Sequence, residues 1–273
     1  MKRFAFLLLI AAGISNMSAQ TILLKNGESV SANGLVRKDD MIMVSVKTST
    51  GGEGQVGFQV ADVAELNLPA PDALATTADL MAKGEFNEAL AQIAPIVDYQ
   101  KTIQDIPGNW WAKSALAEVP VLLALNREAD ASTLANEIAA YSKDPEVLTS
   151  AKLQIALITK FKYPQEALAA FDAIISQSKE PATLSRAWTA EGDVHFAQHE
   201  FDEALLDYLT VTVFYPEHNP LLPKVLWGAG QSYAKLKDMS NATKTYQELI
   251  STYPDSPEAS LAKAELMKKD RKT

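Results

Sequence analysis

The sequence predicts a mainly α fold, a helical solenoid preceded by a small N-terminal β-module. Two stretches near the C-terminus repeat one another at a fixed offset of 38 residues, with Gly192, Ala204, Tyr208 and Pro216 recurring as Gly230, Ala242, Tyr246 and Pro254. Self-similarity at such a period is typical of helical repeat arrays, in which each helix pair buries its apolar face against its neighbours. Before residue 69 the apolar residues alternate instead, which is the period of a β-strand.

Residues 1–19 have the pattern of a secretory signal peptide. Lys2 and Arg3 precede an apolar run, which is followed by a suitable cleavage site at Met17-Ser18-Ala19. That run is too short to span a bilayer, so we expect no membrane insertion. The chain has no cysteine, which excludes disulfides and thiol catalysis. We therefore expect a protein of the Gram-negative periplasm, or a secreted one, that is cleaved near Ala19.

Residues 20–68 are predicted to form the β-module. The expected strands are Thr21 to Leu24, Glu28 to Ser31, Met41 to Val46, Gln55 to Val60 and Val63 to Leu68. Turn residues such as Asn26-Gly27 separate them. Four or five short strands in so few residues favour a bent sheet or barrel like those of SH3 or Sm domains. Residues 69–72 are expected to be a linker.

Residues 73–255 are predicted to form about five helix pairs, of which the last two are the clearest. Residues 83–90 and 163–168 repeat the turn-and-helix pattern of residues 200–205. Trp110 to Leu125 and Ala129 to Tyr141 have helical apolar spacing and supply one further pair. Residues 256–273 are expected to be a C-terminal capping helix with a basic tail, in which Ser256 is the N-cap and Pro257 the first helical residue.

The spacing within each copy resembles the tetratricopeptide (TPR) repeat family. Five residues fall in the order and intervals of the family's motif: Trp188, Gly192, Ala204, Tyr208 and Pro216. In that motif the small residues let the two helices of a pair approach closely, the aromatic residues fill the space beside them, and proline ends the second helix. The chain also resembles bacterial periplasmic TPR proteins, such as those associated with the Tol-Pal system and with outer-membrane barrel assembly.

The resemblance implies a partner-binding groove. In TPR arrays the groove is lined by residues of the first helix of each pair that point away from the second helix. By position, these residues are Arg186, Thr189, Asp193, Phe196, Lys224, Trp227, Gln231 and Lys235. Such a groove favours an extended or helical segment with apolar anchors and some acidic character. The asparagines of the family's clamp for chaperone C-termini are missing at these positions.

No residue pattern indicates catalysis. His195 and His199 lie four residues apart, which is a spacing found in metal sites. However, His195 occupies the packing position that Tyr233 fills in the next repeat, so we expect no metal and no cofactor. Nucleophile-elbow and phosphate-loop motifs are absent from the sequence, so we expect no enzyme. The formal net charge of −9 argues against nucleic acid as a partner.

The sequence thus favours a non-catalytic adaptor that binds a protein or peptide partner in a cell-envelope complex. The alternative is a structural subunit that oligomerises through the β-module and has no peptide ligand.

We predict that the exported chain begins near Gln20, because a signal peptidase cleaves after the small residue at Ala19. Mass spectrometry of the exported protein should find this N-terminus. An exported protein that retains Met1 would contradict both the cleavage and the expected compartment.

Overall fold

The computed structural model describes residues 20–47, 52–217 and 220–270. The expected signal peptide, residues 1–19, lies outside the described residues, as does the end of the basic tail, residues 271–273. The chain divides into two compact units. One consists of Met1–Asp79 and Ala91–Ser114, and the other of Leu80–Leu90 and Ala115–Thr273.

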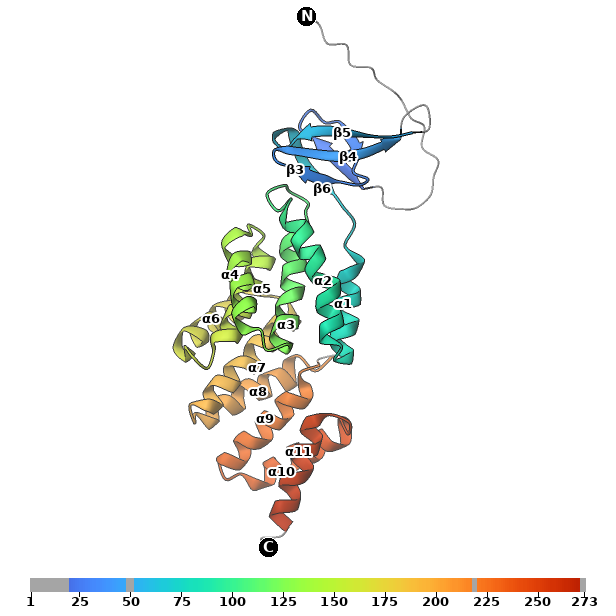
Figure 1. Cartoon of the computed structure of the whole chain (residues 1–273). Helices are drawn as coiled ribbons and strands as arrows, with labels where there is room; N and C mark the ends of the chain where they lie inside the picture. Colours follow the sequence, from blue (N-terminus) through green and yellow to red (C-terminus); the bar gives the residue numbers. More distant parts are fainter. Residues whose placement is uncertain (1–19, 48–51, 218–219, 271–273) are drawn as a thin grey trace, which may run out of the picture. The chain divides into compact units, whose positions relative to one another are not determined.

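The part of the chain that the structure describes contains six strands and eleven α-helices (Figure 1). The strands are β1 (Thr21–Leu24), β2 (Ser29–Ser31), β3 (Val36–Lys38), β4 (Met41–Lys47), β5 (Glu53–Gln59) and β6 (Val63–Asn67). The helices are α1 (Asp72–Lys83), α2 (Phe86–Lys101), α3 (Trp111–Ala124), α4 (Glu128–Tyr141), α5 (Pro145–Thr159), α6 (Pro164–Gln177), α7 (Pro181–Ala197), α8 (Phe201–Phe214), α9 (Leu222–Lys235), α10 (Met239–Thr252) and α11 (Pro257–Asp270). The predicted fold class is confirmed: a mainly helical, TPR-like solenoid follows small antiparallel sheets.

The strands form two antiparallel three-stranded sheets, in the orders β2-β1-β6 and β3-β4-β5. In the first, Ile22 lies opposite Val30 on one side and Leu66 on the other. In the second, Ile42 lies opposite Phe58. These apolar partners share a face of their sheet because side chains directly across a ladder point the same way.

Strand β3 was not predicted from the sequence. Two of its three residues are basic, so the segment shows no apolar alternation. The strand forms because it pairs with β4. Its Arg37 side chain also contacts residues outside the strand. The Arg37 guanidinium donates to the carbonyl of Thr102 at 3.1 Å and pairs with the carboxylate of Asp105.

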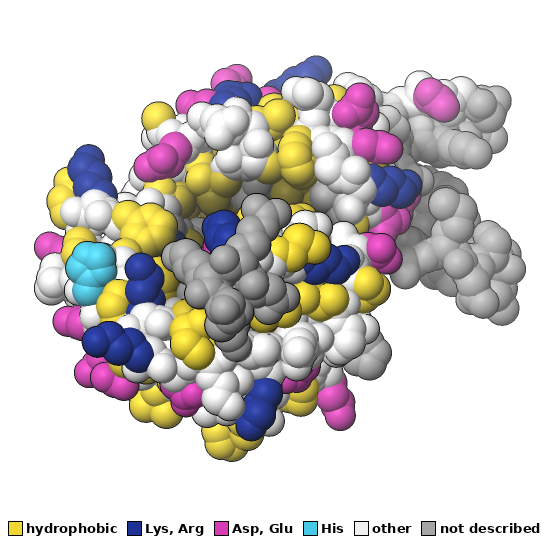
Figure 2. Space-filling model, turned by 90° about the horizontal axis from the view of Figure 1, so that it is seen from below, with side chains coloured by type: hydrophobic (Ala, Val, Ile, Leu, Met, Phe, Trp, Pro, Cys, Tyr) yellow, Lys and Arg dark blue, Asp and Glu magenta, His cyan; other side chains and the backbone are white. Residues whose placement is uncertain are grey.

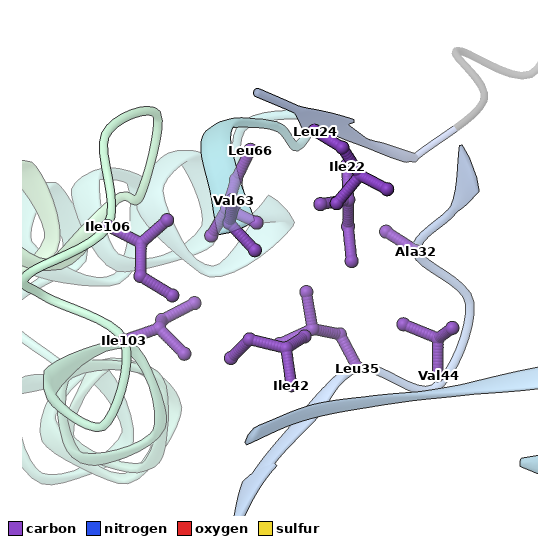
Figure 3. Packing of buried hydrophobic residues seen from close by; sticks show 10 residues of the cluster. All are labelled: Ile22, Leu24, Ala32, Leu35, Ile42, Val44, Val63, Leu66, Ile103 and Ile106. Carbon is purple, nitrogen blue, oxygen red and sulfur yellow. The ribbon is translucent and has the colours of Figure 1, made fainter. Parts of the chain in front are cut away.

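The core of the first unit lies between its two sheets and extends to the segment that follows α2. Figure 3 shows Ile22 and Leu66 facing Ile42 across this core, with Ile103 and Ile106 closing one end. All five side chains are almost completely buried. Ile103 and Ile106 therefore belong to the hydrophobic core of the β-module, although they lie more than thirty residues beyond its last strand.

Three hydrogen bonds join residues 99–110 to strand β6 and to residues next to β3 and β6. The amide of Leu66 donates to the carbonyl of Pro107 at 2.8 Å. The hydroxyl of Tyr99 donates to the carbonyl of Leu35 at 2.9 Å, and the indole of Trp110 donates to the carbonyl of Leu68 at 3.0 Å. Residues 99–110 thus satisfy backbone groups that the short strands leave unpaired.

In the helical unit, each helix from α4 to α11 contacts the next along the chain. The first helices of successive pairs also contact one another, α5 with α7, α7 with α9, and α9 with α11. Helices α5, α7 and α9 therefore lie side by side and share one face of the array, as in other helical repeat proteins. Figure 1 shows the successive antiparallel pairs from α4 onward.

The turns between paired helices repeat as well. His199 and Lys237, at the end of α7 and α9, have positive φ angles of 67° and 65°. The amide of Glu200 donates to the carbonyl of His195 at 2.9 Å and closes the first of these turns. The predicted N-cap of α11 is also present, because the Ser256 hydroxyl accepts a hydrogen bond from the amide of Ala259 at 3.1 Å.

We predict that Gly108→Ala destabilises the β-module more than Gly27→Ala does. Both glycines have similar positive φ angles, 82° and 86°, so alanine costs about 1 kcal/mol at either position. Around Gly27 a new Cβ would meet nothing within 4 Å, whereas at Gly108 it would lie 1.9 Å from the carbonyl oxygen of Leu66. We expect Gly108→Ala to cost at least about 2 kcal/mol more, as the backbone must shift.

Amide hydrogen exchange in β1 and β6 measures this difference. Equal protection in the two variants would show that the segment around Gly108 does not support the sheets.

Candidate functional site

A cavity of about 410 Å³ opens on the face that α5, α7 and α9 share. It is lined by Lys160, Phe161, Asp193, Phe196, Ala197, Tyr208, Lys224, Trp227, Gly228 and Gln231. Five of the eight residues that the repeat spacing placed in a groove are among them: Asp193, Phe196, Lys224, Trp227 and Gln231. The structure therefore brings most of the predicted set together around one cavity.

The carboxylate of Asp193 is the centre of the polar contacts in this cavity. Its Oδ2 accepts hydrogen bonds from the ammonium groups of Lys160 and Lys224, each at 2.6 Å. Its Oδ1 accepts a hydrogen bond from the Tyr208 hydroxyl at 3.1 Å. The Asp193 side chain is 12% exposed, whereas that of Lys224 is 46% exposed. Two cations share one anion, so the cluster keeps a positive charge that faces the cavity through Lys224.

The electrostatics keep this cluster ionised. Burial by itself would raise the pKa of Asp193, but the charges and hydrogen bonds of Lys160 and Lys224 outweigh it, and the pKa is lowered. Burial lowers the pKa of Lys160, and Asp193 partly offsets that effect. Burial, with a further contribution from Asp193, raises the pKa of Tyr208, so its hydroxyl stays protonated and donates.

The position of Tyr208 depends on two glycines. A Cβ on Gly192 would lie 2.9 Å from Cε1 of the Tyr208 ring, and a Cβ on Gly228 would lie 2.6 Å from its Cε2 and Cζ. Real side chains almost never approach so closely, so α7 and α9 can both touch the ring only because these positions carry no side chain. The ring then reaches through to Asp193.

Aromatic side chains form much of the remaining wall. Phe196 packs edge-on against Phe201 of α8, with ring centroids 5.3 Å apart, and Trp227 packs on Tyr246 of α10 at 5.4 Å. Phe161 is 66% exposed, and the Lys160 ammonium lies 4.9 Å from its ring centroid. On the face that Figure 2 shows, Lys and Arg side chains lie beside hydrophobic ones.

Arg186, Thr189 and Lys235 do not line the cavity. Thr189 is only 3% exposed, and its hydroxyl donates to the carbonyl of Ser185 at 2.7 Å. Burial lowers the pKa of Arg186 and Glu180 partly offsets this. Lys235 lies over the ring of Phe201, with 5.9 Å between Nζ and the ring centroid.

The sequence pattern did not indicate Lys160, Phe161, Ala197, Tyr208 or Gly228 as cavity residues. A signal for Lys160 does exist, because Ala167 aligns with Ala204 and the same alignment pairs Lys160 with Ala197 and Lys235. Tyr208 was assigned to helix packing, which it also performs. Its hydroxyl takes part in the site because a tyrosine ring has a polar end that reaches beyond the packed region.

The two described histidines, His195 and His199, lie in different surroundings and do not form a common site. His195 Nδ1 lies 2.7 Å from Asp207 Oδ2, between α7 and α8, whereas His199 lies in the turn with positive φ. Within the described residues there is no group of three or more His, Cys, Asp or Glu side chains placed to hold a metal ion. None of the described helices is both long and apolar enough to cross a membrane.

Comparison with known proteins supports the repeat assignment. Residues 224–256, which cover most of α9, all of α10 and the following turn, match the family model described as tetratricopeptide repeat. This segment is therefore a TPR repeat, and TPR arrays are generally interaction scaffolds that bind protein or peptide partners. No curated protein matches the chain.

Solved structures to which the chain is similar include the following three. YrrB, described as a TPR protein with an unusual peptide-binding site, is 18% identical with a TM-score of 0.43, and the match covers 72% of this chain and 92% of that one. MamA residues 41 to the end, from Desulfovibrio magneticus RS-1, are 14% identical, with a TM-score of 0.46 and coverage of 68% and 98%. PilF of Pseudomonas aeruginosa is 14% identical, with a TM-score of 0.44 and coverage of 71% and 96%.

Proposed function

We propose that this TPR-repeat protein is a non-catalytic adaptor that binds a protein or peptide segment in the cavity formed by the turn after α5 and by α7, α8 and α9. The observation that carries the proposal is the shared carboxylate of Asp193, which leaves one lysine charge uncompensated beside an aromatic wall. A partly desolvated charge is costly without a counter-ion, so an anionic group on the partner completes the cluster.

The ligand that fits this cavity combines an acidic group with an apolar side chain. Lys224 has the exposed ammonium, and an ammonium offers three donors, of which Asp193 takes one. Phe161 exposes most of its ring at the same cavity, so an apolar side chain placed there removes that ring from water. An extended or helical segment can present both groups on one side.

We place this adaptor in the cell envelope, in the periplasm of a Gram-negative bacterium. The signal-peptide pattern at residues 1–19 supports this location. The alternative is a structural subunit that oligomerises through the β-module and has no peptide ligand.

We predict that Lys224→Gln weakens binding of acidic peptides by about tenfold, or ~1.4 kcal/mol, because it removes the exposed cation of the cavity. The probe is an array of synthetic peptides in which each Glu-containing sequence has a twin with Gln at the same place. Lys235→Gln is the matched control, because Lys235 lies on the same helix but does not line the cavity. The wild type and this control should prefer the Glu twin, and Lys224→Gln should lose that preference.

An array without preference for the Glu twins, or equal effects of the two substitutions, would contradict this site. Capture from envelope extract by the wild-type and Lys224→Gln proteins to equal extent would place the natural partner elsewhere, in the first instance on the β-module. Full-length protein is needed for these experiments, because removing the strands would expose Ile103 and Ile106.

A further inference from the structure

A second group of charged side chains lies on α7, away from the cavity. Glu191 and His195 of α7 meet Asp207 of α8 in one helix pair. At the offset of 38 residues, the corresponding positions of the next pair hold Ala229, Tyr233 and Thr245. The three ionisable side chains therefore occur together at one interface, and all three are replaced by uncharged residues at the equivalent one. This joint replacement indicates that they act as a unit.

The carboxyl groups of this unit are buried. Glu191 is 5% exposed and Asp207 is 4% exposed. Asp207 has a partner, because its Oδ2 lies 2.7 Å from Nδ1 of His195. The Oε2 atom of Glu191 is buried and has no hydrogen-bond partner. An unpaired charged oxygen in such a place would cost several kcal/mol, whereas a protonated carboxyl costs much less.

The charged groups that face this unit are almost all acidic. The charges of Asp207 from α8 and Asp172 from α6 act on Glu191, whose carboxyl group also shares a side-chain hydrogen bond with Asp172. Asp207 is influenced by His195, Glu203 and Asp172. Glu200, in the turn after α7, lies 3.9 Å from Nε2 of His195.

Two lysines that contact α7 from other elements do not offset these acids. Lys160, directly after α5, and Lys224 of α9 pair with Asp193 instead. Asp193 lies two residues beyond Glu191, which places it on the other side of a helix with 3.6 residues per turn.

The burial of these carboxyl groups and the acids around them raise the pKa values of Glu191 and Asp207. Burial first, and then the charges of Asp207 and Asp172, raise the pKa of Glu191 from 4.5 to about 8. Burial raises the pKa of Asp207 to about 6, although the hydrogen bond with His195 works against it. With pKa values of about 6 for Asp207 and about 8 for Glu191, Asp207 carries a charge at neutral pH and Glu191 keeps its proton.

We propose that Glu191 is a proton-operated latch between α7 and α8. With its proton, the neutral carboxyl is accommodated in the interface and the two helices stay packed. When the proton passes to solvent, a second buried carboxylate faces Asp207, and the repulsion loosens the interface. The residue after Asp207 is Tyr208, whose hydroxyl donates to Asp193, so opening the latch also disturbs the cavity.

The expected pH dependence has a definite sign. The pKa of Glu191 is higher in the folded protein than its ordinary value of 4.5, so the folded state keeps the proton to higher pH than the unfolded state does. The free energy of unfolding therefore falls as pH rises from about 4.5 to about 8, and changes no further through this group above that range. Asp207 completes its own change below this upper limit, because its pKa is about 6.

The test compares full-length wild-type protein with Glu191→Gln, which keeps the shape of the side chain and cannot ionise. Thermal unfolding at about pH 6.5 and about pH 9 brackets the upper part of the titration of Glu191. The wild-type midpoint should fall by about 5 °C more than that of Glu191→Gln between these pH values. Glu248→Gln, an exposed glutamate of α10, is the matched control and should follow the wild type.

Amide hydrogen exchange of α7 and α8, corrected for the intrinsic effect of pH, gives a second and local readout. Protection should decrease at the higher pH in the wild type and in Glu248→Gln, but not in Glu191→Gln. Glu191→Ala, which copies the residue of the next repeat, should behave like Glu191→Gln even if it is less stable overall. The same pH dependence in wild type and both Glu191 variants, by either readout, would overturn the latch.

Discussion

The contact of the Tyr208 ring with two glycines is the constraint on which the rest of the helical face depends. Gly192 of α7 and Gly228 of α9 leave room for this ring, so helices of successive pairs approach closely at a single aromatic side chain of α8. Close approach lets the apolar residues of each pair be buried, which stabilises a repeat array. The same ring ends in a hydroxyl that orients Asp193, and Asp193 in turn holds Lys160 and Lys224. The same side chain, Tyr208, therefore packs the helices together and positions the charged groups of the cavity.

Helix α7 carries two buried acids whose surroundings give them opposite properties. The pKa of Asp193 is lowered because two lysines outweigh the effect of burial, so this carboxylate is a fixed charge. The pKa of Glu191 is raised because burial and neighbouring carboxyls act in the same direction, so this carboxyl holds a proton. One side of the helix therefore organises the cavity, while on the other side we propose a response to pH.

Periodic features of the fold could be predicted from the sequence, and non-periodic ones could not. Gly192, Ala204 and Tyr208 recur at a fixed offset, and alternating residues marked most strands. Strand β3 and the burial of Ile103 depend on contacts between distant segments, which leave no local pattern. Their positions in the repeat predicted Asp193 and Lys224 as groove residues, and both line the cavity. Thr189 was placed by the same rule, but the structure buries it against the preceding turn of α7. Lys160 was missed because it belongs to a pair with a weaker motif.

Tyr208 fits where it does only because Gly228 lacks a side chain. A double-mutant cycle of Gly228→Ala and Tyr208→Leu, followed by the free energy of unfolding, tests this most directly. Alanine at position 228 should clash with the tyrosine ring but not with leucine, which lacks the atoms that lie 2.6 Å from the new Cβ. The double variant should then be more stable than the sum of the single effects by more than about 1 kcal/mol. Additivity within about 0.5 kcal/mol would contradict the claim, because it would show that the two positions do not constrain one another.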